Sequence, residues 1–375
     1  MLTNLFIIIF MASALLYCLY IYRYQIFWKK GLLTFFDQQE SAPEIFFSII
    51  VPARNEDKRI SECLKSILNQ NYAAGQFEIL VIDDNSTDNT VKLASLFDKV
   101  KVISLTENEQ GKKTAIEKGV QAAKGEHIVI TDADTIRGEY WLKGLSKKNQ
   151  QSETTLLTGP VLYKIEKNNF FEHFQYFDQI AMTGIAASSL GSGKSEMANG
   201  ANMVFKKSFF EKAKPFESNK DFPGGDDIFL LLKALEKDEK VAYSFDYKTI
   251  VFTFCAENFK SFFNQRKRWI AKSKLLGEKR IFITLTLVYF FHLMILASLV
   301  FSIFNPIFLQ VFLVMFLLKS IADYLFISAV AKHFKENLNI LLYPFIQILH
   351  IVYVLIAGVF SISGNFEWKE RKYDF

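Results

Sequence analysis

The sequence predicts an α/β protein with a mostly parallel, doubly wound sheet flanked by transmembrane helices. From Phe46 onwards, short apolar runs typical of buried strands alternate with segments of helical periodicity. Half of the 375 residues are hydrophobic and 39 are phenylalanine, and this excess is concentrated at the two ends of the chain. We therefore expect a water-soluble α/β middle between two membrane-embedded ends.

Charge and cysteine content narrow the class of protein further. The net charge is +5, and much of the basic excess directly precedes the C-terminal apolar block. A basic patch in that place suits an anionic membrane surface better than a nucleic acid, so we expect no nucleic-acid partner. The three cysteines have no metal-binding spacing and indicate a reduced compartment without a disulfide framework.

The N-terminal apolar run, Leu2 to Tyr22, is uncharged and long enough to span a bilayer. Arg23, Lys29 and Lys30 follow it, which places the N-terminus outside and the next domain in the cytoplasm. A cleaved signal peptide ending near Ala14 is the alternative. No basic segment precedes the run, so we expect an uncleaved anchor over residues 1–23 and a linker over residues 24–45.

The middle of the chain, residues 46–258, has the pattern of one domain. Strands are expected at 47–51 (ended by Pro52), 77–82 and 100–105, and helices at 60–69, 90–97 and 111–123. The stretch Ile128 to Thr135 begins as a buried β-branched strand. Asp132 and Asp134 therefore lie at the strand's carboxyl end, where open α/β sheets bind ligands.

Asp132 and Asp134 form an Asp-x-Asp pair where the chain turns. Two carboxylates with this spacing can converge on one hard cation. A pair of solvated turn aspartates is the alternative. The sequence offers no His or Cys cluster that would form a competing zinc site.

Six segments in order resemble a known family. They are Ser48–Glu56, Asp83–Thr90, Asp132–Asp134, Gly200–Met203, Gly225–Asp227 and Gln265–Trp269. In sequence and spacing they resemble family 2 inverting glycosyltransferases of the GT-A fold. The resemblance covers about residues 46 to 275 and implies a GT-A nucleotide-diphospho-sugar transferase domain.

The resemblance also implies which residues contact a nucleotide sugar. Glu56 and Asp84 are expected to contact the nucleotide, although turn capping would explain Asp84 equally. Lys112, near a helix N-terminus, is expected to contact the diphosphate, with Lys113 as a substitute; a solvated lysine pair is the alternative. The resemblance adds these substrate-binding residues: Pro52, Asp132 and Asn202.

By the same resemblance, Asp132 and Asp134 are the metal ligands. Mg²⁺ or Mn²⁺ would bridge the diphosphate of the leaving UDP. Asp227 is expected to be the general base that takes the acceptor's proton, with Asp226 as the fallback. An ordinary helix N-cap is the other interpretation of Asp227.

Residues 259–280 form a basic segment that contains Gln265, Arg268 and Trp269. The resemblance places this Gln-x-x-Arg-Trp pattern in the acceptor and donor pocket. It occurs both in processive polysaccharide synthases and in ceramide-type glucosyltransferases. The alternative is an interfacial amphipathic helix held by anionic lipid, with these aromatic side chains partly inserted: Phe259, Phe262, Phe263 and Trp269.

The C-terminal region, 281–366, holds three apolar stretches before a basic tail, 367–375. Lys319 and Asp323 interrupt the second stretch at i, i+4 spacing and are expected to pair. Three crossings would place the tail outside, yet its basic residues favour the cytoplasm. The stretch from 338 to 366, which contains Pro344, is therefore our first candidate for a re-entrant or interfacial segment. The tail also resembles the cytoplasmic tail of ceramide- and hopanoid-type transferases.

These observations predict an integral protein of a bacterial inner membrane whose catalytic domain faces the cytoplasm. Its expected reaction transfers a sugar once, from a nucleotide sugar, UDP-linked, to a lipid or lipid-linked glycan acceptor. A processive synthase that extrudes its polymer is the alternative enzyme. A non-catalytic membrane scaffold is disfavoured, because the carboxylates of all the motifs are present.

Overall fold

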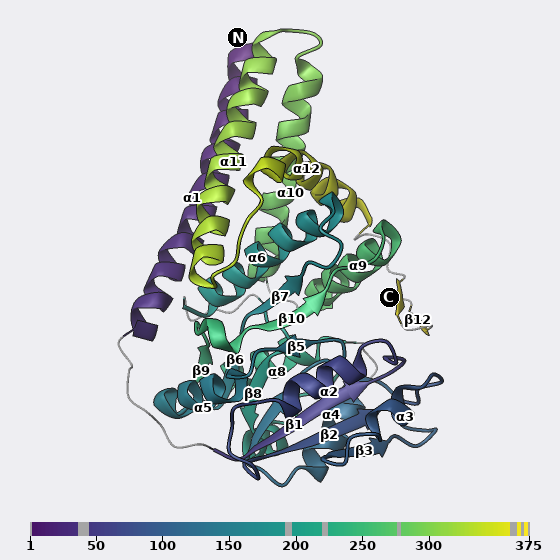
Figure 1. Ribbon diagram of the computed structural model, residues 1–375. Coiled ribbons are helices and arrows are strands. Elements are labelled where there is room, and N and C mark those ends of the chain that lie inside the picture. Colours follow the sequence, from purple (N-terminus) through teal and green to yellow (C-terminus); the bar gives the residue numbers. More distant parts are fainter. Residues whose placement is uncertain are drawn as a thin grey trace. The chain divides into compact units, whose positions relative to one another are not determined.

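The computed structural model describes residues 2–36, 45–191, 197–219, 224–275, 279–360, 366–368 and 371–373 (Figure 1). The chain divides into two compact units, which are described separately. The helical unit comprises Met1–Lys29, Lys167–Gly184 and Ala256–Phe375, and the sheet unit comprises Lys30–Glu166 and Ile185–Cys255. Residues 167–184, expected inside the 46–258 domain, thus cluster with the helical unit.

The sheet unit is built on seven strands in the order β3-β2-β1-β4-β8-β6-β9, with a three-stranded sheet β5-β10-β7 beside them. The strands are β1 Phe47–Ala53, β2 Phe77–Asp83, β3 Val100–Ser104, β4 His127–Ile130, β5 Ile136–Arg137, β6 Leu156–Thr158, β7 Val161–Lys164, β8 Met203–Lys206, β9 Val241–Tyr243 and β10 Val251–Phe254. The helices are α2 Ile60–Leu68, α3 Thr90–Ala94, α4 Lys112–Ala122, α5 Trp141–Ser152, α7 Lys207–Ala213, α8 Asp226–Glu236 and the 3₁₀ turn η1 Tyr247–Thr249.

The predicted fold class is confirmed. Strands β3, β2, β1 and β4 are parallel, and β8 is antiparallel to both of its neighbours. The inner strand β1 is almost wholly buried, as its apolar β-branched sequence predicts. Helix α4 packs onto it so closely that a Cβ on Gly119 would lie 2.6 Å from the side chain of Ile50. The predicted strands and helices are present, although α3 ends at Ala94 instead of Phe97.

Strand β1 does not stop before Pro52, as the sequence suggested, but continues to Ala53. Proline cannot donate to a sheet, and it is normally tolerated where a strand lacks a neighbour on one side. Pairing with β4 ends at Ile50, whereas pairing with β2 continues through Pro52 to Ala53. The missing N–H of Pro52 therefore breaks no hydrogen bond with β4.

The helical unit contains four helices long and apolar enough to cross a membrane, over Leu2–Leu33, Phe282–Phe301, Ile307–His333 and Ile340–Val359 of the described residues. Its elements are α1 Leu2–Phe36, α6 Phe170–Gly191, α9 Phe259–Leu275, α10 Lys279–Phe301, α11 Ile307–His333, the 3₁₀ turn η2 Ile340–Leu342, α12 Tyr343–Phe360, β11 Phe366–Trp368 and β12 Arg371–Tyr373. Helices α1 and α6 each extend into the sheet unit.

Helix α1 extends well beyond the expected end of the anchor at residue 23, so residues 24–36 of the expected linker are helical. Tyr24 and Trp28 are almost completely buried. Tyr24 packs near Phe326 of α11, and Trp28 packs against Phe334, which follows α11. These aromatic contacts explain why the helix continues past its apolar segment.

The predicted pairing of Lys319 with Asp323 is confirmed, with Nζ of Lys319 2.8 Å from Oδ2 of Asp323. The pair is buried. Tyr17 of α1 donates to Oδ1 of Asp323 at 2.8 Å, and Lys319 also donates to the side chain of Gln347 in α12. Because unpaired charges are costly in a membrane, this network stabilises the packing of α1, α11 and α12.

Helix α12 lies across α10 and α11 instead of alongside them (Figure 1). The rings of Phe301 and Phe308, 5.5 Å apart, mark the turn between these two helices. At one end of α12, Tyr343 donates to the carbonyl of Ser320, 12 positions after Phe308. At the other end, Gly358 packs on Tyr289, 12 positions before Phe301. Both ends of α12 therefore lie about 18 Å from the turn, at the same depth in the bundle.

Candidate active site

Asp132 and Asp134 lie directly after β4, as predicted. Both are half-exposed, whereas Ala133 between them is 2% exposed, so the two carboxylates face away from the core. Hydrogen bonds within the loop fix its course. Thr135 donates to the Asp132 carbonyl at 2.6 Å, and its hydroxyl lies 3.1 Å from that of Thr131.

Arg137 holds this loop in place through hydrogen bonds, a role that was not predicted from the sequence. Its Nη2 donates to the hydroxyl of Thr131 at 3.2 Å and to the carbonyl of Thr135 at 3.0 Å. The guanidinium lies 4.9 Å from the ring centre of Trp141. Burial lowers the pKa of Arg137. An arginine three positions after an Asp-x-Asp pair was the only available signal, and an exposed side chain would have given the same one.

Two glycines position the acidic start of α8. Gly224 and Gly225 both have φ of 76°, a conformation that side chains disfavour. The helix begins at Asp226 with Gly225 as its N-cap, so Asp227 is not the N-cap. Asp227 is the second helical residue, and its Oδ1 accepts the N–H of Ile228 at 2.8 Å. Asp226 is buried, whereas Asp227 is half-exposed.

Lys112, the first residue of α4, joins the two acidic segments. Its Nζ lies 2.7 Å from Oδ1 of Asp132 and 3.0 Å from Oδ2 of Asp226. Burial opposes the charge on Lys112, but the two carboxylates outweigh burial and raise its pKa. A Cβ on Gly200 would lie 2.9 Å from the Asp226 carboxylate and 3.3 Å from Nζ of Lys112, so a larger residue would crowd the ion pairs.

Asp84 links the end of β2 to the start of α4. Its Oδ1 accepts the N–H of Gly111 at 2.9 Å, next to Lys112. The loop that carries Glu56 is tied to the same region, because the Glu56 N–H donates to the hydroxyl of Thr90 at 2.7 Å. The fold thus gathers Asp84, Lys112, Asp132 and Asp226 at the carboxyl ends of β2 and β4.

Asn202 differs from the expectation of substrate contact. Its side chain is fully buried. Nδ2 donates to the carbonyls of Pro160 and Thr249 at 2.9 and 2.8 Å, and Oδ1 accepts the indole N–H of Trp141 at 3.0 Å. Both amide hydrogens and the carbonyl oxygen are therefore engaged within the protein.

Gln265, Arg268 and Trp269 lie on α9, in the helical unit. The residue between them, Arg266, forms a buried ion pair with Asp178 of α6 at 2.6 Å and stacks 4.2 Å from the ring centre of Trp269. Burial raises the pKa of Asp178, and Arg266 opposes this shift. In the sequence, Arg266 stands out only as one of the basic residues in the segment 259–280.

Phe262 does not fit the alternative of an interfacial helix, in which it would insert partly into lipid. The side chain is 1% exposed and packs against Phe174 of α6 and Tyr353 of α12. Together with the Arg266–Asp178 pair, this contact fixes α9 against α6.

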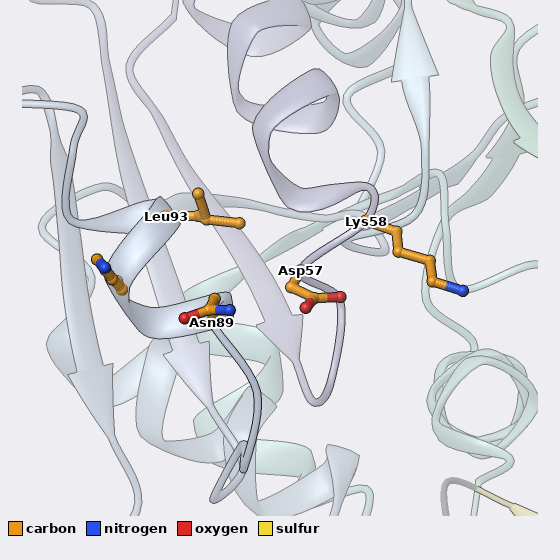
Figure 2. Close-up of a pocket in the computed structure, with 5 residues that line it drawn as sticks. Asp57, Lys58, Asn89 and Leu93 are labelled. Atoms are coloured by element: carbon orange, nitrogen blue, oxygen red, sulfur yellow. The ribbon is translucent and has the colours of Figure 1, made fainter.

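Figure 2 shows a pocket beside the loop that carries Glu56, and its volume is about 430 Å³. Asp57, Asn89 and Leu93 face a common space, while Lys58 extends away from them. Lys92 completes the lining. The pocket contains none of the predicted site residues, and it is separate from the Lys112 ion pairs.

A single cation site made only of protein ligands is not found, because the described residues contain no cluster of three His, Cys, Asp or Glu side chains suited to a metal. Asp132 and Asp134 nevertheless fit a hard divalent cation. They offer carboxylate oxygens, and Mg²⁺ is normally held by one or two carboxylates plus substrate phosphates. The contact between Lys112 and Asp132 also shows that this carboxylate accepts a cationic partner.

The mostly parallel sheet, with acidic loops at the carboxyl ends of its strands, defines the class of GT-A domains. Within that class, residues 48–213 match the model of the family described as Glycosyl transferase family 2. This part of the chain matches family 2, and the resemblance recognised from its motifs is confirmed.

Curated relatives agree with this family over part of the chain. A glycosyltransferase GlyG of Streptococcus pneumoniae serotype 4 is 33% identical over 129 residues, which are 33% of this chain and 42% of that protein. A beta-monoglucosyldiacylglycerol synthase of a Nostoc species is 39% identical over 94 residues, 24% of this chain and 20% of that protein. A mouse dolichyl-phosphate beta-glucosyltransferase is 34% identical over 124 residues, 28% of this chain and 38% of that protein. The matches thus span less than half of each relative.

A solved structure shares the fold over nearly the whole chain. The mannosyltransferase PcManGT from Pyrobaculum calidifontis, solved with GDP-Man and Mn²⁺, has a TM-score of 0.56 at 17% identity. The match covers 94% of this chain and 95% of that one. At this identity the likeness supports the fold alone.

Proposed function

We propose that this protein is a membrane-anchored, metal-dependent, inverting glycosyltransferase. Its donor is a nucleotide sugar, UDP-linked, and its acceptor is a lipid or lipid-linked glycan. One observation carries the proposal: the ammonium of Lys112 lies within hydrogen-bonding distance of both Asp132, in the loop after β4, and Asp226, at the start of α8. These contacts support the proposal that the Asp-x-Asp segment and the Gly-Asp-Asp segment form one site.

The donor end of the site has the chemistry that a nucleotide diphosphate requires. Asp84 and Glu56 lie on loops at the carboxyl edge of the sheet, where α/β folds bind nucleotides. Lys112 opens α4, so its ammonium and the helix N-terminus both favour phosphate. A divalent cation held by Asp132 and Asp134 would neutralise charge on the leaving diphosphate.

In the proposed transfer, the acceptor hydroxyl attacks the anomeric carbon while the bond from that carbon to the diphosphate oxygen breaks. Asp227 takes the hydroxyl proton, and the diphosphate leaves with the bonding electron pair. One displacement inverts the anomeric centre. Asp227 suits this role better than Asp226, because it is half-exposed while Asp226 is buried against Lys112.

For the membrane arrangement, we propose three crossings by α1, α10 and α11. Arg23, Lys29 and Lys30 place the C-terminal end of α1 in the cytoplasm. Because both ends of α12 lie at one depth in the bundle, this helix is proposed to enter the membrane without crossing it. The basic tail after residue 366 then lies on the cytoplasmic side, with the sheet unit.

A lipid-type acceptor is supported by the membrane helices and by the relatives. Two relatives are named for transfer to a diacylglycerol and to dolichyl phosphate. Four candidate spans among the described residues are also few for surrounding a growing polymer.

The test is to incubate the purified full-length protein with a panel of nucleotide sugars and a total lipid extract, followed by mass spectrometry. The expected product is one new glycolipid species whose mass exceeds that of its acceptor by one sugar. A ladder of products would instead support a processive synthase, and no product with any donor would contradict the proposal.

A further inference from the structure

Lys112 pairs with both acidic segments of the proposed site. Family resemblance gives it a diphosphate as its partner, yet its ammonium contacts two carboxylates. One of these belongs to Asp132, a proposed metal ligand. The ammonium of Lys112 would thus have to interact with a diphosphate in addition to its two carboxylate partners, Asp132 and Asp226.

We infer that Lys112 is a charge latch: its ammonium and a divalent cation compete for Asp132, and a nucleotide diphosphate relieves the competition by drawing the ammonium away. Metal and nucleotide therefore bind cooperatively. The inference rests on the proposed function, since it takes Asp132 as a metal ligand and a nucleotide diphosphate as the donor.

The competition follows from charge and distance. Nζ of Lys112 lies 2.7 Å from Oδ1 of Asp132, so a cation bound to this carboxylate would lie next to the ammonium. Like charges within about 4–6 Å of each other are disfavoured. A diphosphate supplies anionic oxygens to the ammonium and to the cation alike, which removes the conflict.

The packing limits where the ammonium can lie. Asp226 is 5% exposed and the Lys112 side chain is 19% exposed. Gly200 closes one side, because even a Cβ at this position would lie 3.3 Å from Nζ of Lys112. Lys112 is therefore held against its carboxylates until an anion provides another partner.

The coupling has a thermodynamic signature. If a nucleotide raises the affinity for the metal by some factor, the metal must raise the affinity for the nucleotide by the same factor. Such couplings are typically about 5–150-fold. A metal held by Asp132 and Asp134 without a latch would also gain affinity from a diphosphate, so Lys112 variants must distinguish the two cases.

The experiment measures Mn²⁺ binding to the full-length protein in detergent, with and without UDP or GDP, by electron paramagnetic resonance of free Mn²⁺. In Lys112→Met, Mn²⁺ alone should bind about tenfold more tightly than in the wild type, while the affinity for the nucleotide falls. The two changes have opposite signs. Simple loss of a phosphate contact would weaken nucleotide binding and leave Mn²⁺ alone unaffected.

Two further variants complete the test. Lys118→Met removes an exposed lysine from the same helix, one that pairs with Glu109 at 3.5 Å, and should bind Mn²⁺ alone like the wild type. Lys112→Arg keeps the charge and should retain weak binding of Mn²⁺ alone. It also serves as the test if Lys112→Met fails to fold, because tighter binding of Mn²⁺ alone by Lys112→Arg would overturn the latch.

The latch is overturned if Lys112→Met binds Mn²⁺ alone no more tightly than the wild type. Its failure is distinguishable from failure of the proposed function. A wild-type preparation that transfers sugar but binds no Mn²⁺ with either nucleotide would overturn the latch and leave a transferase. Coupled binding of Mn²⁺ and nucleotide without any sugar transfer would support the latch and contradict the proposed reaction.

Discussion

Replacing Asn202 by alanine tests whether this residue of the Gly-Ala-Asn segment supports the fold or contacts substrate. The side chain is completely buried and makes three hydrogen bonds, to the carbonyls of Pro160 and Thr249 and from the indole of Trp141. Asn202→Ala leaves two carbonyl oxygens and one N–H without these partners. We expect a loss of stability and not a specific loss of substrate affinity.

The size of the effect follows from the groups that lose their partner. The Pro160 carbonyl still accepts the N–H of Val251 at 3.0 Å, so the Thr249 carbonyl and the Trp141 indole N–H are the two groups left unsatisfied. Each buried polar group left unsatisfied costs about 1–3 kcal/mol, so the lower bound for two is about 2 kcal/mol. For a domain of roughly 150–250 residues, 1 kcal/mol shifts the melting temperature by about 2–4 °C. Asn202→Ala should therefore melt at least about 4 °C below the wild type.

The assay is thermal unfolding of the full-length protein in detergent, together with the KM for the donor below the melting transition. Asn149→Ala is the matched control, since Asn149 is also a buried asparagine but its side chain accepts one hydrogen bond, from Thr154 at 2.7 Å. The control should lose about half as much. An Asn202→Ala variant that melts like the wild type, with a donor KM raised about tenfold, would refute the structural role and restore the substrate contact.

Three further predictions concern catalysis and topology. Asp227→Asn keeps an oxygen that accepts the Ile228 N–H, but the amide cannot take a proton from the acceptor. The variant should bind UDP and metal normally and transfer sugar at least about a hundredfold more slowly. Near-normal transfer would mean that another residue is the general base. Asp226→Asn should show a milder defect in the same assay. Excess EDTA should abolish transfer, and undiminished turnover in EDTA would contradict the metal site. Asp134→Ala should lose metal-dependent nucleotide binding. A reporter fused after residue 45 and one at Phe375 should both report a cytoplasmic location, and an external signal at Phe375 would mean that α12 crosses the membrane.

The amino-acid sequence by itself determined the features that depend on near neighbours in the chain. Apolar β-branched runs predicted the parallel strands, because a strand buried on both faces has no polar alternation. The pairing of Lys319 with Asp323 followed from one turn of helix. The placement of Asp84 and Asp132 at one edge of the sheet followed from their positions at the ends of parallel strands.

Only the tertiary structure decided the contacts between residues distant in sequence. Lys112 might have been a solvated lysine, and its two ion pairs exist because α4 and α8 begin beside the end of β4. Asn202 lies in a segment that resembles a substrate-binding one, yet its side chain points into the core toward Trp141. The hydropathy of α12 indicates a segment long enough to span a membrane. Its contacts with Ser320 and Tyr289, however, place both of its ends at the same depth in the helical bundle. Local sequence fixes helical or strand periodicity, whereas the direction of a side chain or of a whole helix is set by packing partners that lie far along the chain.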